Sequence, residues 1–440
     1  MRRRLLIIVK SFPPYRTEPN TANLAKYLGR QGWEIDVLCS RPGWGVDTRG
    51  LTRDEAQFAA LHPGTTVFPV NTVNPVRGLG LLLKGKGKGG SQGGRLSRRH
   101  VSPLGRLFRS LLHVPDSEYY WLLPAVAGGL RLINERRPDL LVTSGPPFTT
   151  HLAGWKLKKM TGIPWVCHSR DLFLENPLYT PWLPWRRGLD RVLERLVMRS
   201  ADAVTTVYPE ATEILRRRYA REGQVYRTVR NGYDEEVFGA AEPVFPDRFT
   251  VIYGGRLAAD DADGRTGWSL LDGFELWLKR RPGLRTDVRL KLVGNIHPIY
   301  GEEVARRGLA DAVEILPPVP LHDMVGLELG ADVLAIILED SPKNWFTAGG
   351  KIYESARAGR PILGVLPENA AARLIRQKNL GLVARYGSAD QVAAALDALH
   401  EGIESGGFPY GGPERDAFVR ETSFERLAAD FSEILDGLLG

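Results

Sequence analysis

Two glycines, a lysine and a glutamate in the second half of the chain form the pattern with the clearest chemical potential. Gly349 and Gly350 precede Lys351, and Glu354 follows three residues later. If a helix begins here, its free N–H groups and its dipole favour an anion such as a diphosphate, and Lys351 adds positive charge. Glu354 can accept hydrogen bonds from two vicinal hydroxyls, as in a ribose. On spacing alone, a surface helix with a Lys351–Glu354 ion pair explains the pattern equally well.

A histidine in the first half is a second candidate. His168 ends the predicted strand 164–168, and ligands of parallel sheets bind at such strand ends. Its imidazole could polarise a hydroxyl or bind a phosphate, although a lone histidine is more often structural. For Asp171, a catalytic role and a simple ion pair with Arg170 are equally supported. The aromatic stretch 176–185 could stack on a sugar or lipid, but a packed loop explains it slightly better.

The stretch around Lys351 resembles the donor-binding segment of family 4 of the GT-B retaining glycosyltransferases. Many members of that family read Lys-x-x-Glu-x-x-x-x-Gly-x-Pro, and this pattern is matched by Lys351, Glu354, Gly359 and Pro361. In the family, the glutamate binds the ribose of the donor nucleotide. The resemblance therefore implies ribose binding by Glu354, with Gly349, Gly350 and Lys351 at the diphosphate.

Other segments resemble the same family in their order and spacing over most of the chain. Tyr253-Gly254-Gly255-Arg256 is similar to the strand and loop whose arginine contacts the donor diphosphate, which implies donor contacts for Gly255 and Arg256. The family also places a functional histidine at the position of His168. The remaining matches are 231–234 with Phe238 at the hinge, and 11–14, 143–147 with His151, and 164–171, which look like a subgroup acting on cell-surface polysaccharide or lipid-linked acceptors.

The chain departs from the family pattern at three positions. Phe346 stands where many members carry a second glutamate, so its sugar contact is lost or comes from another group such as Lys343 or Asn344. Arg265 lies just before the place of a lysine-glycine pair and could take over a diphosphate contact, although its planar guanidinium is not equivalent to an ammonium group. Glu18-Pro19 replaces a glycine pair in the first loop, which bears on the acceptor pocket.

The resemblance implies an enzyme, a glycosyltransferase of the hexosyltransferase type. It would move a sugar from a UDP- or GDP-sugar to a hydroxyl of a sugar or lipid-linked acceptor, with retention, in cell-surface glycan or glycolipid assembly. Arg256, Lys351 and Arg265 would stabilise the departing diphosphate in place of a metal, and no cofactor besides the donor substrate is expected. Two alternatives stay open: a nucleotide-sugar epimerase of the same fold, and a catalytically silent sugar-nucleotide-binding or scaffold subunit, which Phe346 supports.

The elements that must position these residues alternate between strands and helices, as parallel sheets covered by helices do. In the first half, the predicted strands are 5–9, 35–39, 139–143, 164–168 and 202–207, and the predicted helices are 23–30, 150–160 and 185–199. In the second half, the predicted strands are 249–253, 288–293, 313–316, 333–337 and 361–365, and the predicted helices include 268–280 and 424–439.

We therefore expect an α/β protein with two doubly wound Rossmann-like domains facing across a cleft, the GT-B arrangement. Residues 1–240 would form the N-terminal, acceptor-side domain, and residues 241–440 the C-terminal domain that binds the nucleotide sugar. The boundary lies near 234–248, where the stretch 239–246 has the composition of a linker. The final helix is a candidate to pack back on the first domain.

The positive charge of the chain is concentrated in one insertion. The net charge is +8, yet no acidic residue occurs over 56–115, which holds nine Lys and Arg. The glycine-rich stretch 84–94 is typical of a flexible loop, and apolar spacing over 104–112 predicts an amphipathic helix. Core packing, docking on an anionic membrane surface and binding of a phosphate-bearing acceptor all explain the insertion 77–113, and its charge favours the last two. No nucleic-acid-binding module is visible.

Composition restricts the setting. The 440 residues, 43% hydrophobic and 25% charged, suit two globular domains. Cys39 and Cys167 are too few for a disulfide framework and fit a reduced cytosol. The N-terminal apolar run stops at Lys10, too early for a signal peptide, and no stretch reaches the ~20 apolar residues of a membrane span. We expect a cytoplasmic protein, peripheral on the inner face of the membrane through 84–113.

Overall fold

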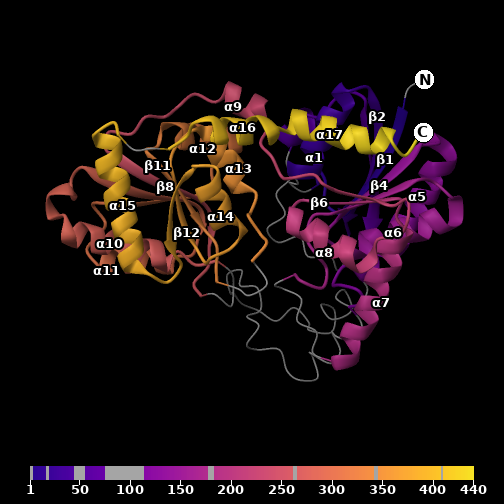
Figure 1. The fold of residues 1–440 in the computed structure, drawn as a ribbon, viewed down its shortest axis with the longest axis horizontal. Coiled ribbons are helices and arrows are strands. Elements are labelled where there is room, and N and C mark those ends of the chain that lie inside the picture. Colours follow the sequence, from indigo (N-terminus) through magenta and orange to yellow (C-terminus); the bar gives the residue numbers. More distant parts are fainter. Residues whose placement is uncertain are drawn as a thin grey trace. The chain divides into compact units, whose positions relative to one another are not determined.

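The structure forms two compact α/β units. The computed structural model describes residues 3–15, 19–43, 55–74, 113–176, 183–260, 265–340, 345–407 and 410–440. Unit 1 comprises Met1–Asn231 and Phe424–Gly440, and unit 2 comprises Gly232–Ser423. Each unit contains a parallel sheet with helices packed against it (Figure 1). The predicted pair of doubly wound, Rossmann-like sheets is confirmed.

Unit 1 is built on a seven-stranded sheet in its described residues, with the order β3-β2-β1-β4-β5-β6-β7. The chain order reverses between β1 and β4, which is the switch point where ligands of such sheets bind. The strands are β1 (Arg3–Val9), β2 (Trp33–Pro42), β3 (Thr65–Thr72), β4 (Leu140–Gly145), β5 (Trp165–Ser169), β6 (Ala203–Thr206) and β7 (Val225–Thr228). The helices are α1 (Pro19–Arg30), α2 (Glu55–Ala59), α5 (Leu122–Arg136), α6 (Phe148–Thr161), α7 (Pro184–Ser200), α8 (Pro209–Tyr219) and α17 (Phe424–Asp436).

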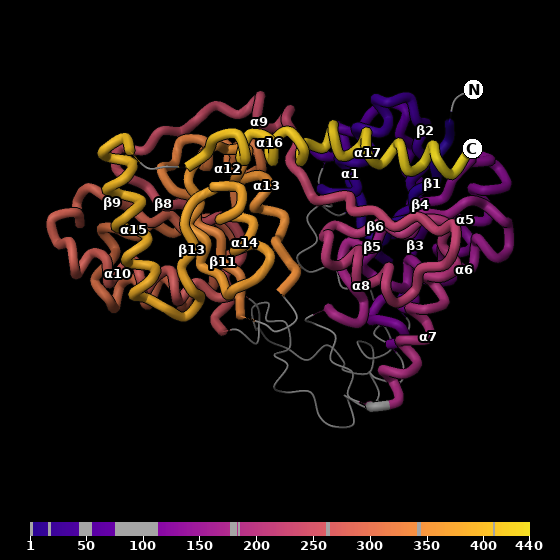
Figure 2. The backbone as a smooth tube through the Cα atoms, viewed as in Figure 1, coloured from indigo at the N-terminus to yellow at the C-terminus, as the bar shows by residue number. Residues whose placement is uncertain are grey.

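The last helix, α17, belongs to the core of unit 1 although it lies at the far end of the chain. It packs along α1, as the yellow tube in Figure 2 shows. Phe424, Phe431 and Leu435 are buried together with Leu5 and other strand residues. The indole nitrogen of Trp33 donates to Ser432 Oγ over 2.8 Å. The C-terminal segment therefore ties the end of the chain to the first sheet.

Unit 2 contains, in its described residues, a six-stranded sheet of order β10-β9-β8-β11-β12-β13, with its switch point between β8 and β11. The strands are β8 (Phe249–Leu257), β9 (Val288–Ile296), β10 (Val313–Leu316), β11 (Val333–Ile337), β12 (Ile362–Leu366) and β13 (Gly381–Arg385). The helices are α9 (Glu235–Ala240), α10 (Trp268–Arg280), α11 (Ile299–Arg306), α12 (Leu321–Gly330), α13 (Lys351–Ala358), α14 (Ala370–Gln377), α15 (Ala389–Glu404) and α16 (Pro413–Glu421).

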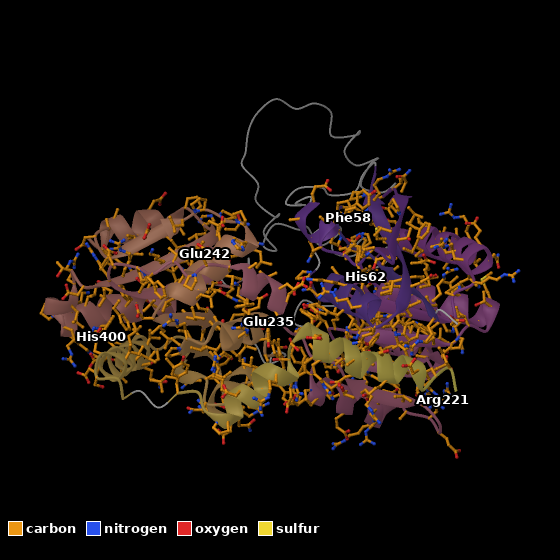
Figure 3. All side chains as sticks on the ribbon, turned by 90° about the horizontal axis from the view of Figure 1, so that it is seen from above. Phe58, His62, Arg221, Glu235, Glu242 and His400 are labelled. Carbon is orange, nitrogen blue, oxygen red and sulfur yellow. The ribbon has the colours of Figure 1, made fainter. Side chains whose placement is uncertain are left out.

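The boundary of the units differs from the division at residue 240 that we drew from the sequence. Residues 232–240 pack within unit 2, where Tyr233 and Phe238 join the cluster around Ile252. Glu235, labelled in Figure 3, forms an ion pair with Arg357 of α13. The stretch 239–246, which has the composition of a linker, is mostly exposed. The packing of α9, however, places residues 232–240 in unit 2.

Several predictions fall outside the described residues. These are the basic insertion 77–113 apart from His113, the part 177–182 of the aromatic stretch, Glu18 of the first loop, and Lys343 with Asn344. Within the described ranges, every helix is too short or too polar to cross a membrane.

Candidate functional site

The glycine pair and Lys351 lie where unit 2 reverses its strand order. α13 begins at Lys351, directly after Gly350, and follows the stretch that leaves the carboxyl end of β11. Gly349 has a φ of 74°, a conformation that L side chains rarely adopt, so glycine is required there. The backbone N–H of Tyr353 donates to the carbonyl of Gly350 over 3.2 Å. The predicted helix N-terminus after the two glycines is thus present.

The ammonium group of Lys351 lies over the end of β8. A Cβ built on Gly254 would be 3.2 Å from Lys351 Nζ and 2.4 Å from Met324 Cε, so the missing side chain of this glycine makes room for both. Lys351 Nζ is also 3.7 Å from Glu328 Oε1 on α12. Burial raises the pKa of Glu328, and the charge of Lys351 opposes this rise. A buried carboxylate therefore holds Lys351 at the strand end.

Glu354 sits one turn along α13 and carries a strongly shifted carboxyl. Burial raises its pKa to about 7, the nearby Lys351 lowers it, and Glu328 raises it further. Within the described residues, Lys351 and Glu354 do not form the simple ion pair of an ordinary surface helix; Lys351 pairs with Glu328 instead. A carboxyl poised in this way is typical of functional sites, where burial and a charge partner act together.

Arg256 and Gly255 form the end of β8. Gly255 has a φ of 151° and pairs with Gly294 of β9, where an added Cβ would lie 2.1 Å from the carbonyl oxygen of Gly255. Since alternate residues of a strand share a face, the exposed Arg256 projects to the same side as Gly254, over which Lys351 lies. The structure therefore brings two cations to one strand end.

Arg265 already has a partner within unit 2. Its Nε lies 3.8 Å from Glu339 Oε2, just beyond β11, and neither atom has a hydrogen-bond partner. Arg265 therefore reaches the switch point, at the ends of β8 and β11, but next to a carboxylate that offsets its charge. Phe346, which replaces the second family glutamate, is buried, while its neighbour Trp345 is half-exposed.

His168 belongs to unit 1 and is enclosed by it. Its side chain is 5% exposed, its Nδ1 lies 2.9 Å from Thr205 Oγ1, and its ring contacts Phe431 edge-on. Burial lowers its pKa to about 3, helped by the charges of Arg170 and His151, so the imidazole is neutral near pH 7. These surroundings suit a structural histidine, and the catalytic role of His168 stays a prediction.

Glu328 was not singled out from the sequence, and Arg170 was considered there only as an ion-pair partner of Asp171. Glu328 follows Met324 by one helical turn on α12, so both side chains lie on the buried face of the helix. An acidic residue on an otherwise apolar helix face was the sequence pattern that could have indicated this residue. Arg170 acts on both His151 and His168 and lowers the pKa of Asp171, which burial raises. The charge of Arg170 therefore acts on Asp171 as well as on the two histidines.

No cluster suited to a metal ion occurs in the described part of the chain, where three or more His, Cys, Asp or Glu side chains nowhere converge. The charges at the switch point of unit 2 are instead Arg256, Arg265 and Lys351 with the carboxyls of Glu328, Glu339 and Glu354. Such a set can bind an anion through its cations and hydroxyl groups through Glu354.

Comparisons with known proteins agree with this fold. Residues 17–232 match the model of the glycosyl transferase 4-like domain. No curated protein sequence matches the chain. A sucrose-phosphate synthase from Thermosynechococcus elongatus is similar in structure, with a TM-score of 0.64, 15% identity and 99% of each chain covered.

Two other solved structures are similar over nearly their whole length. A lipopolysaccharide outer core galactosyltransferase has a TM-score of 0.57 and 13% identity, with 99% of each chain covered. A putative UDP-N-acetylglucosamine 2-epimerase from Listeria monocytogenes has a TM-score of 0.59 and 12% identity, with 99% of this chain and 96% of that chain covered. At these identities the similarity shows the fold, which is GT-B.

Proposed function

We propose that the chain, whose residues 17–232 match the model of the glycosyl transferase 4-like domain, transfers a hexose from a UDP- or GDP-sugar to an acceptor hydroxyl. The acceptor is a sugar or a lipid-linked glycan, and the reaction serves cell-surface glycan or glycolipid assembly. The galactosyltransferase of the lipopolysaccharide outer core has the same fold, which supports this choice of acceptor class. The matched domain lies in unit 1, so the donor assignment rests on the geometry of unit 2.

The observation that carries the proposal is the position of Lys351 over the end of β8, with Glu354 one turn behind it on α13. The diphosphate of the donor binds at the N-terminus of α13, beside Gly349 and Gly350, where amides and Lys351 are available. Arg256 and Lys351 stabilise the charge that builds on the departing diphosphate. Glu354 accepts hydrogen bonds from the ribose hydroxyls.

We further propose that the transfer proceeds with retention and without a metal ion or cofactor, since positive side chains converge at the site. Arg265 contributes to the same anion site once the donor diphosphate competes with Glu339 for its guanidinium. The protein would work in the cytoplasm, on the inner face of the membrane, with the basic stretch 84–113 facing anionic lipids. His168 would act on the acceptor side, in unit 1.

An assay for product distinguishes this proposal from its two rivals. The purified chain is incubated with UDP- and GDP-sugars, with and without lipid-linked acceptors, and released nucleotide and sugar isomers are measured. Nucleotide release that requires acceptor supports transfer. Isomerised sugar without acceptor supports an epimerase, a candidate favoured by the similarity to a putative epimerase. Binding without any conversion supports the silent subunit that Phe346 suggested.

The pKa of Glu354 predicts how donor affinity depends on pH. Burial raises this pKa to about 7, so the carboxyl is mostly protonated below that pH and ionised above it. Ribose hydroxyls donate to the ionised form, so we expect the Kd of a sugar nucleotide to be about tenfold higher near pH 6 than near pH 8. Calorimetric titration across this range checks it. The sugar nucleotide is used because a terminal phosphate itself titrates near pH ~6.

Glu354→Gln is the matched control for this pH dependence, since it keeps the shape of the side chain but cannot titrate. The residual affinity of the variant should change little over the same pH range. An equal pH dependence in the variant and the wild type would assign the effect to another group, with Glu328 the nearest carboxyl.

A further inference from the structure

The N-terminal part of helix α7 in unit 1 buries charged side chains and exposes apolar ones, whereas Val197 and Met198 near its end are buried. Arg186, Asp190 and Glu194 point inward and are buried. The outward face instead carries Trp185, Leu189 and Val192, which are 51%, 36% and 62% exposed. This spacing of four and three residues places them in one stripe along the helix. A helix of a protein surrounded by water shows the opposite arrangement.

Specific contacts fix α7 in this orientation. Arg186 Nε lies 2.8 Å from Asp190 Oδ1, and the same guanidinium donates to the carbonyl of Pro115 over 2.6 Å. One turn further, Tyr219 of α8 donates to Glu194 Oε2 over 2.6 Å. Turning the apolar stripe inward would break these buried contacts and leave charges unpaired, which is costly. The stripe therefore stays on the surface.

A row of arginines runs beside the apolar stripe. Arg187, Arg191, Arg195 and Arg199 are all exposed and succeed one another at intervals of one helical turn. Both acidic residues of α7 are among its buried ones, so no carboxylate of the helix faces outward. Within the described residues, none of these four guanidinium groups forms an ion pair.

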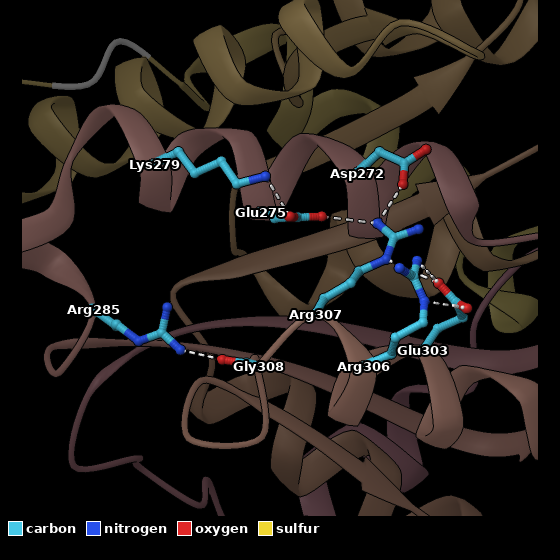
Figure 4. Close-up of polar contacts among 8 residues, drawn as sticks. All are labelled: Asp272, Glu275, Lys279, Arg285, Glu303, Arg306, Arg307 and Gly308. Atoms are coloured by element: carbon cyan, nitrogen blue, oxygen red, sulfur yellow. Dashed lines mark hydrogen bonds and ion pairs between the residues drawn. The ribbon is translucent and has the colours of Figure 1, made fainter.

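Some other arginines have carboxylate partners, whereas the exposed Arg137 and Arg227 form no ion pair among the described residues. In Figure 4, Arg306 and Arg307 contact Glu303, and Arg307 also contacts Asp272 and Glu275. In unit 1, Arg216 of α8 lies 2.8 Å from Glu213. What distinguishes α7 is that four such arginines follow one another along a single helix, which makes this face suitable for an anionic partner.

We propose that the outward face of α7 docks on an anionic lipid bilayer. Trp185, Leu189 and Val192 enter the interfacial region, and the arginine row contacts lipid phosphates. A membrane interface offers what this face lacks, a phosphate layer directly above hydrocarbon, and Trp suits that boundary. In Figure 1, the N-terminal half of α7 projects beyond the other helices of unit 1.

This inference rests on the proposed function only in taking a membrane as the partner. It adds α7 to the contact proposed for the stretch 84–113, and it involves no sugar nucleotide. A protein that binds nucleotides but not vesicles would contradict the α7 proposal alone. A protein that binds vesicles but not nucleotides would contradict the proposed donor site alone.

The test is flotation of the full chain with vesicles of phosphatidylcholine, alone or mixed with phosphatidylglycerol. We expect binding to the mixed vesicles, weakened by salt. Replacing Arg187, Arg191 and Arg195 by glutamine should weaken it about 100-fold, since each cation near an anionic surface contributes a factor of about five. Replacing Trp185, Leu189 and Val192 by glutamine should weaken it at least ~10-fold through lost apolar burial.

Helix α5 supplies matched controls within the same unit. Leu123 is 79% exposed and Arg131 is exposed, so Leu123→Gln and Arg131→Gln change the same residue types away from α7. Both controls should bind vesicles like the wild type. Because all these side chains are exposed, thermal unfolding should be unchanged, which shows that lost binding does not reflect lost folding.

A second measurement locates the contact. Brominated lipids should quench tryptophan fluorescence in the wild type, and Trp185→Phe should bind vesicles with most of that quenching removed. The proposal is overturned if the α7 variants bind as the wild type does, or if binding is equal on neutral vesicles. It is likewise overturned if the variants change only the oligomeric state, because the stripe would then be a contact between copies of the chain.

Discussion

Replacing Lys351 by glutamine should lower kcat by about 10²–10³-fold, the loss expected when one group that stabilises transition-state charge is removed. The ammonium group lies over Gly254 at the end of β8, beside the N-terminus of α13, where the leaving diphosphate is proposed to bind. Its effect should appear mainly in kcat, because charge on the diphosphate increases as the glycosidic bond breaks. Single-turnover measurement with saturating donor checks this.

Glu328 complicates this variant and also supplies its control. The substitution leaves the buried Glu328 without its cation, which could destabilise unit 2. The double variant Glu328→Gln, Lys351→Gln removes both charges, so it should fold like the wild type and still show the low kcat. If the double variant has normal stability and the kcat of the wild type, Lys351 does not stabilise the transition state.

Gly294→Ala should lower the midpoint of thermal unfolding by roughly 10 °C, corresponding to about 3 kcal/mol. Gly294 has a φ of 128°, and a Cβ at this position would lie 2.1 Å from the carbonyl oxygen of Gly255. A backbone carbonyl cannot turn away as a side chain can, so β8 and β9 must separate where Arg256 emerges. Donor affinity should therefore fall together with stability.

Gly283→Ala is the control for this prediction. Gly283 is exposed in the same unit, and a Cβ there would meet nothing within 4 Å. Scanning calorimetry of the three proteins compares them directly. Equal unfolding midpoints for Gly294→Ala and Gly283→Ala would show that the close approach of the strands does not matter.

Buried strands were predictable because their sequences are almost purely apolar. The predicted strand 333–337 coincides with β11, whose five residues are all buried, and the predicted strand 313–316 coincides with the edge strand β10. β3 was not assigned, since Thr65–Thr72 is polar, includes a proline and lies at the sheet edge. Helix α5 was also not predicted, because Gly128 and Gly129 disfavour a helix locally. They are kept there by packing, since a Cβ on Gly129 would lie 2.5 Å from Leu157 Cδ1.

The residues of the candidate site that lie on one segment could be predicted from the sequence. The contacts between residues of different segments could not. Lys351 and Glu354 lie on one helix, so their spacing was sufficient. The contacts of Lys351 with Glu328 and of Arg265 with Glu339 join different elements, and only the folded sheet brings them together. For His168, a strand end looked accessible from the sequence, but Phe431 of the final helix packs against its ring.

The most direct test of the central claim is calorimetric titration of UDP, GDP and their common sugars into the wild type and Glu354→Ala. We predict that one nucleotide binds selectively and that the variant binds it ~10–100-fold more weakly, as expected for lost hydrogen bonds to a charged group. That result would place the ribose at Glu354 and identify the base of the donor. If the folded wild-type protein binds none of these ligands, the donor site assigned to unit 2 is wrong.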